Sequence, residues 1–168
     1  MELYETKSRI AEALVESIFR RARYRLRPYR ADKVSPVRFG REDFCPNFHA
    51  VTGEGDATRE VLIEVKYRPF IEQFMSLENQ RNGSSIMRLA RRYWPDLTFV
   101  LVTDHPDTGR SCFQLIQPPV EHEPLTTIDL VERTELRIFQ HNVEDHETLL
   151  RRIYALLSGE AVTGVLRT

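Results

Sequence analysis

The sequence has few lysines, few cysteines and no long apolar run, and each shortage limits what the chain can be. Only three of its 24 basic residues are lysines, Lys7, Lys33 and Lys66. No window reaches 18 uncharged apolar residues, so we expect no membrane-spanning helix. Acids near the start replace the basic and apolar pattern of a signal peptide, and we expect a cytoplasmic protein. Cys45 and Cys112 are expected to be buried free thiols.

Signature motifs of several enzyme classes are also missing. The chain has no phosphate-binding P-loop, dinucleotide fingerprint, serine-hydrolase elbow or CxxC pair, and its five histidines form no ligand cluster. A net charge of −1 excludes a protein that binds nucleic acid through overall charge. With 168 residues and 41% hydrophobic residues, the chain suits a single domain over residues 1–168.

Hydrophobic periodicity predicts an α/β fold with a mixed β-sheet flanked by helices. The segment 118–142 gives no clear prediction, and Asn142 is the expected N-cap of the last helix. The expected helices are residues 4–22, a segment from 70 to 93 that is interrupted at 82–85, and 143–159. The expected strands are 24–29, 43–51 and 59–68 (a hairpin), 97–103 and 111–117.

The stretch "VLIEVKYR" at residues 61–68 carries two charged residues inside an apolar strand. Alternation places Leu62, Glu64 and Lys66 on one face, and Val61, Ile63 and Val65 on the other. One interpretation is an ordinary ion pair on a half-exposed sheet. The other is part of a metal-dependent site, because a carboxylate can hold a divalent cation beside a lysine that contacts a phosphate.

The order of the elements and three short stretches resemble the PD-(D/E)xK, or restriction-endonuclease-like, nuclease superfamily. "EVK" corresponds to its Glu-x-Lys motif, "CPNF" to its Pro-Asp motif, and "SRIAEALVESIFRRARYRL" to its first helix. The resemblance covers about the first 105 residues. Holliday-junction resolvases and small repair or defence nucleases are the members it resembles most. This chain departs from the pattern at Asn47, where the superfamily has an aspartate.

The resemblance implies a restriction-endonuclease-like fold and a set of site residues. Glu64 would bind Mg²⁺ or Mn²⁺, Asn47 would be a weaker ligand, and Lys66 would contact water and phosphate. Glu12 would act outside the first layer of ligands or help to bind a second metal ion. Glu12 lies at the edge of the apolar stripe of its helix, whereas Glu16 lies on the polar side. An amide oxygen can ligate a metal, but it brings no negative charge.

Arginines cluster in "FRRARYRLRPYR", residues 19–30. Arg21, Arg23, Arg25 and Arg27 are candidate contacts to DNA phosphates, with the last three expected on one strand face. The alternative is a charged edge strand that resists pairing with other sheets.

Three functional hypotheses follow. The first is an Mg²⁺-dependent endonuclease that hydrolyses phosphodiester bonds in DNA. The second is a catalytically inactive nuclease fold that binds nucleic acid or a partner protein. The third is a protein-interaction module in which Glu64 and Lys66 only pair with each other. The resemblance is compatible with a homodimer or a larger complex.

Overall fold

The computed structural model describes residues 2–29, 37–39, 42–117 and 123–159, with backbone alone for 37–39 and 42–44. The helices are α1 (Leu3–Arg21), α2 (Ile71–Arg81), α3 (Ile86–Tyr93) and α4 (Gln140–Leu157). The strands are β1 (Arg25–Pro28), β2 (Val37–Phe39), β3 (Glu42–Phe44), β4 (Phe48–Thr52), β5 (Arg59–Tyr67), β6 (Leu97–Val102), β7 (Phe113–Ile116) and β8 (Thr127–Asp129).

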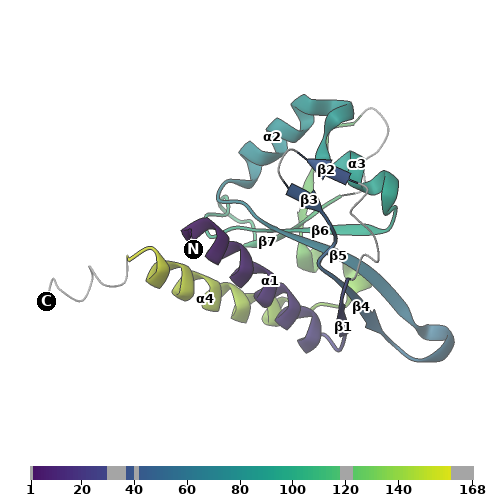
Figure 1. Cartoon of the computed structure of the whole chain (residues 1–168). Coiled ribbons are helices and arrows are strands. Elements are labelled where there is room, and N and C mark those ends of the chain that lie inside the picture. The colour runs from purple at the N-terminus through teal and green to yellow at the C-terminus, as the bar shows by residue number, and fades with distance from the viewer. Residues whose placement is uncertain (1, 30–36, 40–41, 118–122, 160–168) are drawn as a thin grey trace, which may run out of the picture.

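The fold is α/β, built on a six-stranded mixed sheet in the order β1-β4-β5-β6-β7-β8. Among the described strands, β5 and β6 form the one parallel pair, joined by α2 and α3. Strands β4 and β5 form a hairpin, which extends beyond the rest of the sheet in Figure 1. Strands β2 and β3 pair separately.

Helices cover both faces of this sheet (Figure 1). Helices α1 and α4 lie on the face that carries Ile63, Val65 and Tyr67 of β5, and these residues join the larger apolar core. Helices α2 and α3 cover the face that carries Phe99 and Leu101 of β6. Leu62, Glu64 and Lys66 alternate with the first set and therefore belong to the α2 and α3 face.

Helix α1 forms where its apolar residues recur every three or four positions. Ala11, Leu14, Val15, Ile18 and Phe19 are buried, as the predicted stripe required. The helical segment from 70 to 93, predicted to be interrupted at 82–85, forms two helices, because the backbone at 82–84 forms a short 3₁₀ turn. Within the described residues no helix is long and apolar enough to cross a bilayer.

Several predicted boundaries were wrong. The expected strand 43–51 is two strands in different sheets, with residues 45–47 between β3 and β4. Asn142 does not cap α4, because the helix begins at Gln140, and the Asn142 amide instead donates to the Ile18 carbonyl at 2.9 Å. Cys112 is buried as expected, whereas Cys45 is only half-buried.

Arg23 does not belong to a strand face. It has a left-handed backbone with φ of 69° and lies before β1, which begins at Arg25. The backbone turns sharply there, after the end of α1, to enter the sheet, and Tyr24 donates its backbone N–H to the Phe19 carbonyl. The predicted row of three arginines is therefore reduced to Arg25 and Arg27.

Candidate functional site

Strand β5 places an acid and a lysine in contact on one face of the sheet. Lys66 Nζ lies 3.0 Å from Glu64 Oε1, and the Lys66 side chain is 25% exposed. Glu64 is almost fully buried, with 2% of its surface exposed. Within the described part of the chain its second oxygen, Oε2, is buried and accepts no hydrogen bond. A buried carboxylate oxygen without a partner is costly, so an ion pair alone does not account for this group.

Burial raises the pKa of Glu64 to about 7. The positive charge of Lys66 and its hydrogen bond lower the pKa, and the nearby carboxylate of Glu12 raises it. The effect of Glu12 means that two acids face a common region, although they lie 52 positions apart in the sequence. A positive group placed between them would relieve the repulsion.

Asn47, the residue just before β4, also joins the site. Its backbone N–H donates to the Ile63 carbonyl at 2.8 Å, and its side-chain Oδ1 accepts from the Val65 N–H at 2.6 Å. The chain leaves the sheet just before this residue, so the Asn47 side chain supplies the acceptor that a preceding strand residue would have supplied. The amide thus holds β5 beside Glu64.

Helix α1 adds Glu12 to the same group. A hydrogen bond from the Asn47 side chain and the charge of Lys66 lower the pKa of Glu12, but burial has the larger effect and raises it. A carboxylate only accepts, so the amide must donate through its Nδ2. Asn47 therefore bridges Glu12 on α1 and the backbone of β5. The four residues expected from the sequence, Glu12, Asn47, Glu64 and Lys66, are brought together.

A cleft of about 440 Å³ opens beside these residues. Lys66, Glu12 and Arg68 line it, together with Tyr4, Glu5, Ser8, Val65 and Tyr67. Arg68 lies two positions after Lys66, just beyond the end of β5, and lowers the pKa of Glu64 through its charge. It donates to the Tyr4 hydroxyl at 2.6 Å. Sequence reasoning missed Arg68, although the alternation in "EVKYR" was a signal for it.

The predicted DNA-contacting arginines divide into two groups. Arg27 is opposite His49 on β4, which is opposite Leu62 on β5, so Arg27 shares the sheet face of Glu64. Arg25, two positions earlier, has the same orientation, and both are exposed. Arg21 instead lies 2.6 Å from Asp145 on α4. The structure therefore brings Arg25 and Arg27 to the candidate site face but not Arg21.

These residues fit a hard divalent cation in part. Mg²⁺ prefers oxygen ligands and keeps several waters, so one or two carboxylates are sufficient. The Oε2 of Glu64, which has no partner among the described residues, is suited to that role, with Glu12 as the second carboxylate nearby. No cluster of three or more His, Cys, Asp or Glu ligands occurs among the described residues. Asn47 as a metal ligand stays a prediction, because its oxygen already accepts from Val65.

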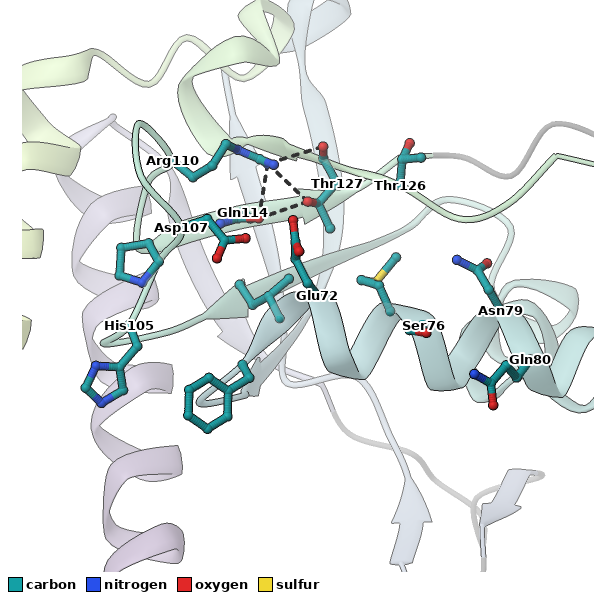
Figure 2. A pocket seen from close by; sticks show the side chains of 14 residues that line it. Glu72, Ser76, Asn79, Gln80, His105, Asp107, Arg110, Gln114, Thr126 and Thr127 are labelled. Atoms are coloured by element: carbon teal, nitrogen blue, oxygen red, sulfur yellow. Dashed lines mark hydrogen bonds between the residues drawn. The ribbon is translucent and has the colours of Figure 1, made fainter.

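A larger cavity of about 790 Å³ is lined by residues of α2, of the loop between β6 and β7, and of β7 and β8 (Figure 2). Arg110 lines it and donates to Gln114 and Thr127, so this guanidinium is already engaged. Glu72 shares a hydrogen bond with Asp107, which raises the pKa of Glu72. Two acids in the lining would repel a phosphate, so this cavity does not suit the chemistry of the Glu64 site.

Comparison of the chain with protein-family models, with curated proteins and with solved structures gives no match.

Proposed function

We propose that the chain has a restriction-endonuclease-like fold and hydrolyses phosphodiester bonds in DNA with Mg²⁺ or Mn²⁺. The observation that carries the proposal is Glu64, a buried carboxylate with one oxygen on Lys66 and the other unpartnered within the described residues. A fold does not normally keep such a group for stability, because it is destabilising without a ligand. The convergence of Glu12 and Asn47 on the same place adds to this support.

Each side chain has a defined part in the proposed reaction. Glu64, with Glu12 nearby, would hold a divalent cation, which when bound would polarise the phosphate and lower the pKa of a bound water. Lys66 donates to a phosphate oxygen and stabilises the charge that develops there. Glu12, whose pKa is raised, accepts a proton from water or returns one to the leaving oxygen. Asn47 holds Glu12 in place, and Arg68 adds positive charge beside the cleft.

A second candidate function is a nuclease fold that binds DNA without cutting it. Asn47 favours it, since it stands where an aspartate would have added a charged ligand and its oxygen is engaged with Val65. The Arg25 and Arg27 face would serve either function. Cleavage separates the two candidates.

The test is a cleavage assay on labelled duplex, branched and single-stranded DNA with Mg²⁺, Mn²⁺ or a chelator. We expect metal-dependent cleavage that Glu64→Gln and Lys66→Ala both abolish. Lys66→Ala should leave DNA affinity within about twofold, because one cation contributes little to the salt-dependent binding. Glu144→Gln, an exposed acid on α4, is the matched control and should cut normally. Binding without cleavage would favour the inactive fold, and cleavage by Lys66→Ala would contradict the assignment.

A further inference from the structure

Three aromatic side chains form a cluster beside the candidate site, which we call the aromatic platform (Tyr29, Tyr93 and Trp94). The rings of Tyr29 and Trp94 meet edge to face at 6.2 Å, and those of Tyr93 and Trp94 lie 6.1 Å apart. Trp94 Nε1 donates to the Tyr29 hydroxyl at 3.1 Å, which fixes two rings from distant parts of the sequence. The platform is therefore ordered without a ligand.

The platform begins next to the site residues. Tyr29 donates its backbone N–H to the Asn47 carbonyl at 3.1 Å. Its ring lies 5.4 Å from that of His49, which is opposite Leu62, two residues before Glu64. A DNA strand bound at the candidate site could therefore reach the platform along the same face of the sheet.

The charges around the platform suit a polyanion. Arg27 is opposite His49, and Arg25, opposite Val51, lies on the same face farther from Tyr29, so two exposed arginines lead along this face to Tyr29. The face also carries an acid, Glu60, whose Oε1 lies 2.8 Å from His49 Nδ1. Glu60 lies toward the far end of the hairpin, opposite Val51, and not at Tyr29.

The three rings of the platform are not fully buried in the core. Tyr93 is 54% exposed, and Tyr29 and Trp94 are half-buried. Burying an exposed aromatic ring is favourable, and a base stacks well on such a ring when its own face is free. In a duplex the neighbouring base pairs cover the base faces. Unpaired bases are thus the partner that this surface fits.

We propose that the aromatic platform stacks unpaired bases and directs the chain toward single-stranded or locally unwound DNA. This inference rests on the proposed function, since it names the substrate class of that site. In this arrangement the phosphates would contact Arg25 and Arg27 and the bases would stack on Tyr93 and Trp94, along the sheet face that carries Glu64.

Trp94 allows a direct test, because it is the only tryptophan in the chain. Its emission can be followed while DNA of about 12 nucleotides, single-stranded or duplex, is added in chelator. We expect the single strand to quench the emission and to bind about 10-fold more tightly than the duplex. Equal quenching by both forms, or none by either, would overturn the inference.

Variants separate stacking from general charge attraction. Tyr93→Ala changes an exposed ring, so the fold should tolerate it. It should weaken single-strand binding about 10-fold and leave duplex binding unchanged. Phe139→Ala, whose ring is 77% exposed just before α4, is the control and should change neither. Loss of affinity for both DNA forms, or for neither, would contradict a stacking role for Tyr93.

Cleavage assays keep this inference distinguishable from the proposed function. Quenching by single strands without cleavage in any metal would support the platform and refute the proposed hydrolysis. Metal-dependent cleavage of duplex and single strands at equal rates, with Trp94 emission unchanged, would support the hydrolysis and refute the platform.

Discussion

Replacing Glu64 by glutamine separates a functional site from a structural ion pair. The change keeps the shape of the side chain and an oxygen that can accept from Lys66. In the parent, Lys66 Nζ lies 3.0 Å from Glu64 Oε1. It removes a negative charge that is buried with one oxygen unpartnered within the described chain. If Glu64 is kept for function, its removal should stabilise the protein without metal.

The pKa of Glu64 sets the size and the sign of the effect. Its pKa rises from 4.5 to about 7 on folding, so the folded state holds an extra proton between these values. Stability is therefore lost as the pH rises through this range. A difference of about 2.5 pH units at about 1.36 kcal/mol each corresponds to about 3 kcal/mol in full. We expect Glu64→Gln to be about 1–3 kcal/mol more stable than the parent at pH 8, and about equal at pH 4.5.

Urea unfolding at both pH values in chelator measures this difference. Glu78→Gln is the matched control, because Glu78 is equally buried but both of its oxygens have partners. Glu78 Oε2 accepts from Ser85 Oγ at 2.6 Å and from the Ile86 N–H at 3.0 Å. This variant should be less stable by about 1–3 kcal/mol. If Glu64→Gln, like Glu78→Gln, is less stable than the parent at pH 8, Glu64 and Lys66 are a structural ion pair and the argument from the buried acid fails.

Two further predictions concern the DNA-binding face and Asn47. Replacing Arg25 and Arg27 by serine should reduce the log–log salt slope of DNA binding by about 2, measured by fluorescence anisotropy, and an unchanged slope would assign both arginines to edge protection. Asn47→Asp keeps an acceptor for Val65 but cannot donate to Glu12, so without metal it should lose about 1–3 kcal/mol in thermal unfolding. Added Mg²⁺ should restore more stability to this variant than to the parent, and an equal effect would remove residue 47 from the cation site.

The sequence predicted the elements that have strong periodicity. Helix α1, the β4–β5 hairpin, β6 and β7 were expected near their observed positions, because burial imposes a repeat on their apolar residues. Strand β8 was missed, since Thr127–Asp129 is short and half-buried, with no apolar alternation. Polar contacts hold it instead: Arg110 reaches Asp129 Oδ1 at 3.0 Å and the Thr127 carbonyl at 3.2 Å. Such contacts leave no periodic signal.

The candidate site also contains residues that the sequence predicted and residues that it did not. Glu64 and Lys66 follow from strand alternation, and Glu12 from its place beside an apolar stripe. The platform could not be foreseen, because Trp94 meets Tyr29 only after α3 has folded back over the sheet, 65 positions away. The buried pair of Lys7 and Asp104, 3.2 Å apart, is similarly distant in sequence. Long-range polar contacts of this kind depend on packing geometry, which residue patterns do not encode locally.

Asn47 also affects which acids can supply carboxylates to the site. An aspartate there would place a carboxylate against Glu12, which now receives a hydrogen bond from the Asn47 side chain. Asparagine removes that repulsion and still satisfies the Val65 N–H. Helix α1 thus contributes the second carboxylate near Glu64, and Asn47, just before β4, contributes the group that orients it. On this reasoning the absence of an acid at position 47 does not by itself imply loss of cation binding, provided that Glu12 stays in place. Removing Glu12 should therefore weaken metal-linked stabilisation as strongly as removing Glu64.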